Sequence, residues 1–159
     1  MIRNADFNDM DSILRIYSYA REFMRENGNP NQWDDNFPPL SIIEDDIVKK
    51  QLFVYDDCGG IHGVFAFIIG DDETYAHIEQ GEWLSCGKYG TIHRIATDGT
   101  IHGFLRQTVM FCENRIPHLR IDTHEDNVIM RHLIVECGFR QCGIIRVRGG
   151  SPRIAYEKI

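Results

Sequence analysis

The chain has 159 residues, of which 43% are hydrophobic and 26% are charged, and its formal net charge is −7. This length and apolar content suit a single domain with a substantial core, so we expect residues 1–159 to fold as one unit. The acidic balance disfavours general nucleic-acid binding, because a surface that follows a phosphate backbone needs clustered Lys and Arg.

The sequence has no apolar run long enough to cross a bilayer, and its polar N-terminus is unlike a signal peptide. The five cysteines are odd in number and show no CxxC spacing, which indicates reduced thiols. Histidines and cysteines do not form the close pairs that structural zinc sites use, so we expect no metal. We therefore expect a cytoplasmic protein that does not act on membranes.

The first part of the chain predicts a short strand and two helices. Met1–Asn4 has the character of an edge strand, and the apolar positions that follow recur every three or four residues until Asn27-Gly28 ends the helix. The second helix should run from about Ser41 to Lys50. Ser41 and Glu44 have the spacing of a capping box at its start.

The middle of the chain predicts a hairpin and then a long extended region. Two β-rich runs flank the glycine-containing turn at 57–60. We interpret Asp71-Asp72-Glu73 as a solvated turn, after which a strand should begin near Thr74. Residues 78–83 are strand-like apart from a glycine, and Tyr89–Thr97 resumes the extended pattern.

The remaining elements follow the Asp98-Gly99 break. A helical pattern runs from Phe104 through Cys112, Pro117 stops it, and a strand, a helix and a terminal hairpin follow. Their expected ranges are His118–Thr123, Val128–Cys137, Arg140–Val147 and Arg153–Lys158. The order β-α-α-β-β-β-α-β-α-β-β predicts an α+β fold, a mixed sheet flanked by helices. The strands on either side of the third helix should be parallel, since a helical crossover joins them.

The turn before the third helix carries the clearest chemical signal. The first amides of a helix have no partner within the helix and lie at the positive end of its dipole. An anion, most often a phosphate, binds well at such a position.

This order of elements, with Asn127 and the pair Gly138-Phe139 in the second half, resembles the GNAT superfamily of acetyl-CoA-dependent N-acetyltransferases. The pyrophosphate loop of that family reads R/Q-x-x-G-x-G/A, and residues 100–105 fall on it with the middle glycine matched. Thr100 stands where Gln or Arg is usual, and Leu105 stands where a small residue is usual.

The resemblance implies a site for acetyl-CoA between the two parallel strands, where the pantetheine arm pairs with exposed backbone of the first strand. Asn127 then contacts the cofactor or an ordered water, or it is simply the cap of the fourth helix. The cofactor-binding residues that the resemblance implies are Ile95, Ala96, Thr97, Ile101, His102, Gly103, Phe104, Leu105, Arg106 and Asn127.

Acetyl transfer to an amine needs a base, and His93 and Glu79 are the candidates, with His93 having the more suitable ordinary pKa. The alternative is that His93 is a hydrogen-bonded structural residue and Glu79 a solvated one. The family's usual acid is a tyrosine in the last helix, but Ile134 occupies that position here. Either the thiolate leaves unassisted, or another group such as Tyr89 or His132 donates a proton, or the protein is not a catalyst. In the family the loop between the first two helices borders the acceptor, so Trp33 and Phe37 are candidates for substrate binding or for core packing alone.

Two functions therefore remain open. One is transfer of an acetyl group from acetyl-CoA to a primary amine of a small molecule or peptide, by direct attack in a ternary complex. The other is a non-catalytic module of the same fold that binds an acyl-CoA or another small ligand. Net negative charge favours cationic amines at long range. The terminal hairpin offers an edge through which a homodimer could form.

Overall fold

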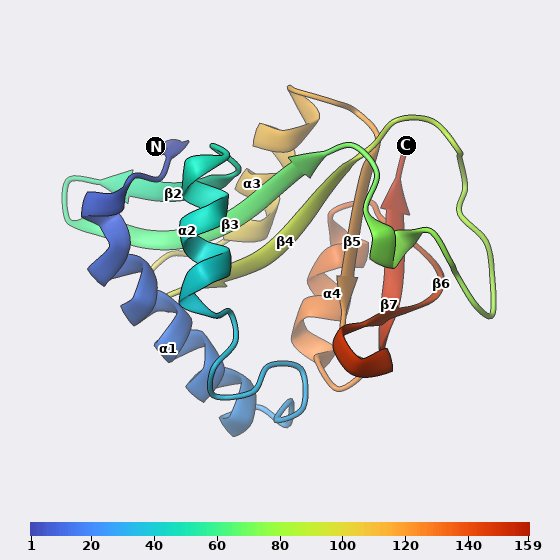
Figure 1. The fold of residues 1–159 in the computed structure, drawn as a ribbon, viewed down its shortest axis with the longest axis horizontal. Helices are drawn as coiled ribbons and strands as arrows, with labels where there is room; N and C mark the ends of the chain where they lie inside the picture. The colour runs from blue at the N-terminus through green and yellow to red at the C-terminus, as the bar shows by residue number, and fades with distance from the viewer.

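A seven-stranded mixed sheet runs through the molecule (Figure 1), and the computed structural model describes all of residues 1–159. The strands are β1 (Ile2–Asn4), β2 (Leu52–Asp57), β3 (Gly60–Ile69), β4 (Gly90–Thr97), β5 (Leu119–Thr123), β6 (Arg140–Val147) and β7 (Ser151–Lys158). The helices are α1 (Met10–Glu26), α2 (Leu40–Val48), α3 (Phe104–Glu113) and α4 (Val128–Glu136). The order predicted from the sequence is confirmed.

The strands lie in the order β1-β2-β3-β4-β5-β7-β6, and only β4 and β5 are parallel neighbours. They are parallel because α3 crosses from the end of one to the start of the other. The α+β class and the mixed sheet are confirmed.

The helices form two layers, with α1 and α2 on one face of the sheet and α3 and α4 on the other (Figure 1). Alternation along β3 explains how one strand serves both layers. Val64 and Ala66 pack in the cluster that contains α1 and α2, whereas Phe65 and Phe67 pack in the cluster with α3 and α4. The sheet is therefore buried on both sides in its central part.

The strand expected near Thr74 is wrong, because residues 73–75 form a 3-10 turn and an irregular loop follows as far as β4. A single bridge between Glu79 and Ile144 connects that loop to β6. Gly81 permits this close approach, since a Cβ there would lie 1.8 Å from the carbonyl oxygen of Cys142. Its apolar side chains Tyr75, Ile78 and Trp83 pack in one cluster against β6 and β7 and do not form a strand of the sheet.

The predicted capping box at Ser41 is also wrong. Helix α2 begins at Leu40, its N-cap is Pro39 with an extended backbone (ψ 151°), and no side chain caps it. Proline fixes φ in a range that suits entry into a helix, so the helix begins directly after Pro39. Ser41 then lies within the first turn and is not in the N-cap position.

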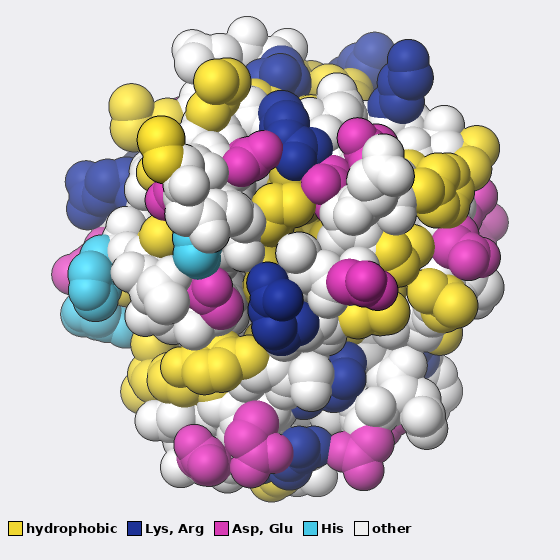
Figure 2. Space-filling model, turned by 90° about the vertical axis from the view of Figure 1, so that its left-hand side faces the viewer, with side chains coloured by type: hydrophobic (Ala, Val, Ile, Leu, Met, Phe, Trp, Pro, Cys, Tyr) yellow, Lys and Arg dark blue, Asp and Glu magenta, His cyan; other side chains and the backbone are white.

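No helix in the structure has the combination of length and apolarity needed to cross a membrane. On the face that carries the β2–β3 turn, acidic and basic side chains are interspersed with apolar ones, and no continuous basic area covers it (Figure 2).

Candidate active site

The two parallel strands separate partway along their length. Pairing between β4 and β5 joins Gly90–Ile92 to Leu119–Ile121 and then stops, although both strands continue. A register shift in the pairing of β3 with β4 accompanies the separation, and Arg94 has a left-handed backbone (φ 51°) there. The hydroxyl of Tyr17 donates to the carbonyl of Arg94 at 3.1 Å. Beyond Ile92, β4 therefore has no strand partner on the side that faces β5.

Two hollows meet at this separation. The inner cavity has a volume of about 270 Å³ and is lined by Trp33, Phe37 and His93 among others. The outer groove, of about 430 Å³, follows the end of β4 and the start of α3. The residues that line both are Met24, Ile95, Asn127 and Met130. A molecule lying in the groove can therefore reach the inner cavity between β4 and α4.

The start of α3 presents a run of free backbone donors to the outer groove. The N–H groups of residues 101–106 have no acceptor within the protein. Gly103 has a left-handed backbone (φ 67°), and open space surrounds its missing side chain. The side chain of Leu105 packs in the core cluster of α3, so its bulk does not obstruct the backbone donors. This arrangement suits an anion.

The walls of the outer groove are apolar. Tyr19 and Phe23 of α1 stack with their ring centroids 6.4 Å apart, and Ile129 and Leu133 of α4 lie on the groove as well. All four side chains are partly exposed to solvent. Exposed apolar groups on both walls indicate that a ligand covers them.

A small polar cluster fixes the turn at the end of β4. The carboxylate of Asp98 contacts His62 Nδ1 at 2.7 Å and accepts from the hydroxyl of Thr100 at 2.6 Å. Hydrogen bonding to Asp98 raises the pKa of His62. Gly99 lies against Tyr19 in this turn, where a Cβ would come within 2.3 Å of the Tyr19 hydroxyl. The turn is therefore positioned by side chains from β3 and α1.

His93 projects from β4 onto the inner cavity, where its Nε2 lies 2.8 Å from Asp72 Oδ2. Asp72 also accepts from the amide and the hydroxyl of Thr74, at 2.9 and 2.6 Å. Burial alone would raise the pKa of Asp72, but the hydrogen bonds from His93 and Thr74 outweigh it and hold the pKa well below its usual range. The carboxylate thus stays charged and orients the imidazole.

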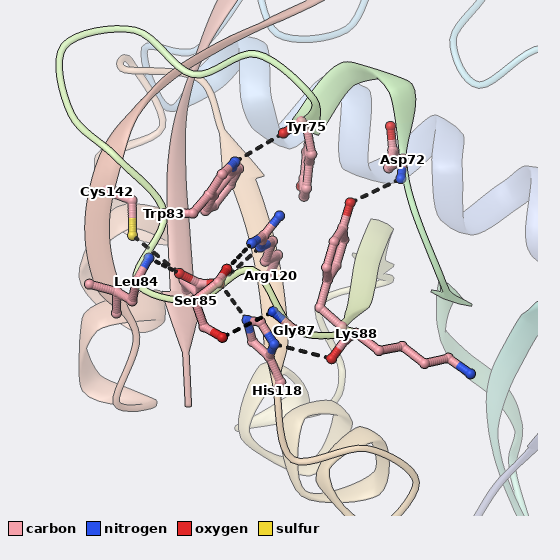
Figure 3. Close-up of polar contacts among 12 residues, drawn as sticks. Asp72, Tyr75, Trp83, Leu84, Ser85, Gly87, Lys88, His118, Arg120 and Cys142 are labelled. Atoms are coloured by element: carbon pink, nitrogen blue, oxygen red, sulfur yellow. Dashed lines mark hydrogen bonds and ion pairs between the residues drawn. The ribbon is translucent and has the colours of Figure 1, made fainter.

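The interpretation of Asp72 as part of a solvated turn is therefore wrong. Its amide donates to the hydroxyl of Tyr89 at 3.0 Å, and Tyr89 belongs to a buried network (Figure 3). In that network Arg120 lies between the rings of Trp83 and Tyr89, 3.9 Å from each centroid. Glu157 is fully buried and is bound by both Arg120 and His118. The network holds the loop that carries Asp72 against the sheet.

Gln32 connects the loop between α1 and α2 to the rest of the site, a role that no sequence pattern indicates. Its Oε1 accepts from Asn29 at 2.8 Å, from Asn127 at 2.9 Å and from Thr123 at 3.3 Å. Its backbone carbonyl accepts from Arg153 at 2.7 Å. Gln32 therefore holds together the junction between the inner cavity and the outer groove.

Asp122 is a second acidic side chain that sequence analysis missed. It lies on β5 at the separation, lines the inner cavity and accepts from the hydroxyl of Tyr75 at 2.6 Å. Alternation along β5 places it only on the same face of the sheet as Arg120, so no local pattern would have selected it.

The aromatic candidates pack in the core and also face the inner cavity. Trp33 and Phe37 belong to the core cluster of α1 and α2, and they also line the inner cavity. Asn127 is the N-cap of α4, where its Oδ1 accepts from the amide of Met130 at 3.1 Å. It faces both hollows at the same time.

Glu79 does not lie beside the separation. It is on the irregular loop, lines neither the inner cavity nor the outer groove, and its carboxylate pairs with Arg146 at 3.1 Å. The expectation that it shares the site with His93 is wrong, because residues 78–83 do not form a strand of the sheet. Arg106 is exposed and its side chain is not on the groove wall, although its amide is among the free donors.

Ile134, at the position of the family's usual acid, is fully buried in the core. None of the residues that line both the inner cavity and the outer groove is a tyrosine.

The structure is similar to those of known acetyltransferases. A GNAT-family acetyltransferase from Streptococcus agalactiae is 32% identical, with a TM-score of 0.90 over 100% of this chain and 94% of that one. A GNAT-family acetyltransferase from Listeria monocytogenes is 21% identical, with a TM-score of 0.73 over 99% and 93%. The protein yncA from Salmonella typhimurium, solved with its cofactor acetyl-CoA, is 17% identical, with a TM-score of 0.60 over 99% and 91%. No family model matches the sequence, and no curated protein does.

Proposed function

Because the chain belongs to the GNAT family of acetyltransferases, we propose that it transfers an acetyl group from acetyl-CoA to a primary amine, by direct attack within a ternary complex. The observation that carries this proposal is the opening between β4 and β5, which has unpaired backbone on one wall and free helix-end donors at its mouth. Residues 1–159 act as one catalytic domain in this proposal.

The outer groove would hold acetyl-CoA. The free amides of residues 101–106 suit the pyrophosphate, since they carry partial positive charge and need an acceptor. The backbone of Ile95–Thr97 is available to pair with the amide groups of the pantetheine arm. Asn127 stands where the groove meets the inner cavity. The apolar walls from α1 and α4 would cover the rest of the arm.

The inner cavity would hold the acceptor between Trp33, Phe37 and His93. When bound, acetyl-CoA supplies a thioester carbonyl that an amine can attack. An amine near neutral pH is protonated and must lose a proton before it attacks. With Nε2 of His93 donating to Asp72, Nδ1 is the ring nitrogen left to accept that proton. His93 is therefore the proposed base and Asp72 its positioning residue.

The thiolate would leave without a tyrosine acid. A thiol has an ordinary pKa near 8.5, so its thiolate is stable enough near neutral pH to depart unassisted. The side-chain amide of Asn127, which donates to Gln32, is the polar group at the junction of the two hollows.

The test combines calorimetry with a thiol-release assay. Acetyl-CoA should bind to the folded protein, and a panel of primary amines should release free CoA that a thiol reagent detects. His93→Gln should lower kcat/KM by roughly 10²- to 10⁴-fold, the usual contribution of a general base, without changing acetyl-CoA affinity. His77→Gln is the matched control, because His77 is 81% exposed and lines neither hollow.

Absence of acetyl-CoA binding to folded protein would contradict the proposal as a whole. Binding without thiol release for any amine would instead favour the non-catalytic binding module, to which the buried Ile134 in place of the acid also points.

A further inference from the structure

The charged groups of the inner cavity are unevenly paired. Arg94 forms an ion pair with Asp46 at 2.6 Å, and Asp72 is matched by His93. Arg148 and Arg153 also line the cavity, but neither forms an ion pair with a carboxylate. Two guanidinium groups of the terminal hairpin are therefore outside any ion pair, although the charge of Asp122 acts on both through space.

Arg153 is 4% exposed, and burial lowers its pKa. Its guanidinium donates to neutral acceptors, the carbonyl of Gln32 at 2.7 Å and the hydroxyl of Ser151 at 2.6 Å. A buried cation is costly unless an anion or several hydrogen bonds compensate it. Three hydrogen bonds, including one to the carbonyl of Pro152, offset part of this cost, and Asp122 acts on Arg153 through space without forming an ion pair with it.

Arg148 lies at the mouth of the cavity in the turn between β6 and β7. Its guanidinium carbon lies 3.5 Å from the centroid of the Phe37 ring, and it makes a single hydrogen bond, to the carbonyl of Gln32 at 3.3 Å. Most of its N–H donors are therefore free. A guanidinium held flat on an aromatic ring with its edge unoccupied is prepared for bidentate binding of a carboxylate or phosphate.

We propose that the acceptor amine also carries an anionic group, a carboxylate or a phosphate, which Arg148 binds directly and Arg153 attracts from behind. This inference rests on the proposed function and names the class of its substrate. On β5, Asp122 supplies a negative charge to the same cavity. The cavity thus offers opposite charges to the two ends of a small zwitterionic amine, such as an amino acid.

The net charge of the chain cannot itself attract the anionic group of such a substrate. With a formal charge of −7, the protein repels anions at long range. Screening limits that repulsion to about 10 Å at ordinary salt, whereas contact with Arg148 acts within the cavity. Recognition of the anionic group therefore depends on contact with Arg148 and not on overall charge.

The experiment uses matched pairs of acceptors. Each amino acid is compared with its α-amide, and phosphoethanolamine with ethanolamine, with thiol release as the readout. The anionic member should have the higher kcat/KM, by roughly 10- to 100-fold, which is what hydrogen bonds to a charged group are worth. Preference within the amino-acid pairs identifies a carboxylate acceptor, and preference within the other pair identifies a phosphate.

Arg148→Gln should abolish this preference, mainly by raising KM for the anionic acceptors. Arg146→Gln is the matched control, since Arg146 is on the same hairpin but exposed and paired with Glu79 outside both hollows. Acetyl-CoA affinity should be unchanged in both variants.

A readout without turnover keeps the two proposals separate. Acetate or inorganic phosphate should shift the Nε resonance of Arg148 in a nuclear magnetic resonance titration, and Arg146 should not respond. If neither ion shifts it, or if neutral amines are acetylated as well as their anionic partners, the inference is overturned while acetyl transfer stands. If acetyl-CoA itself does not bind, the proposed function is what has failed.

Discussion

Replacing Asp72 with asparagine tests how the candidate base is oriented. The substitution keeps the shape of the side chain, and one oxygen can still accept from Thr74. The change falls on the atom 2.8 Å from His93 Nε2, where an amide N–H replaces a carboxylate oxygen. The imidazole must then present Nε2 as an acceptor and carry its proton on Nδ1. Nδ1 can no longer accept a proton from an amine in the inner cavity.

The magnitude follows from that one contact. A hydrogen bond to a charged group contributes about 1.5–3 kcal/mol, and each 1.36 kcal/mol of barrier is about a tenfold change in rate. Asp72→Asn should therefore lower kcat/KM by roughly 10- to 150-fold. Acetyl-CoA affinity should not change, because Asp72 lines the inner cavity but not the outer groove.

Steady-state thiol release and calorimetry with acetyl-CoA measure the two quantities. Asp71→Asn is the control, since it removes the same charge from the adjacent exposed residue, which makes no hydrogen bond or ion pair. If Asp72→Asn retained kcat/KM within about twofold of Asp71→Asn, the role given to the contact with His93 would be refuted.

Three further predictions concern the groove and the core. Gly99→Ala should reduce the free energy of unfolding by about 1–3 kcal/mol in urea titrations, because φ is +82° and the new Cβ would meet the Tyr19 hydroxyl. Wild type should lose its stability advantage over His62→Gln as pH rises from 6 to 9. The contact with Asp98 raises the His62 pKa, so the stabilisation is complete below the ordinary histidine pKa and is lost as pH rises through the folded-state value. Ile134→Tyr should reduce the free energy of unfolding by about 1–3 kcal/mol through overpacking of a fully buried site, and should not raise kcat.

Each of these has its own control or contrary result. In Gly103→Ala the new Cβ lies in open space and only the backbone is strained, so this substitution should destabilise the protein less than Gly99→Ala. Equal losses of unfolding free energy would show that the contact with Tyr19 does not contribute. A constant stability difference between wild type and His62→Gln across the pH range would contradict the predicted loss of stabilisation at high pH. A stable Ile134→Tyr with faster turnover would show that the acid position faces the site.

Several features of the fold were readable from the sequence because they depend on neighbours in the chain. The three- and four-residue spacing of α1, the turn glycines and the helical crossover between β4 and β5 are short-range signals, and each was confirmed. The error at residues 73–83 has a physical cause. Their composition is that of a strand, but Tyr75, Ile78 and Trp83 pack as separate side chains against β6 and β7, and composition does not report strand pairing.

The order of the elements, the parallel pair and the donor-rich start of α3 were predictable from the amino-acid sequence, since these follow from local periodicity and from backbone groups that every residue carries. Three-dimensional packing was needed to show that strand pairing stops after Ile92, that Asp72 meets His93, and that Gln32, Asp122 and Arg148 face the same cavity. Those contacts join residues far apart in the chain. They depend on sheet register and loop packing, which no stretch of sequence specifies alone.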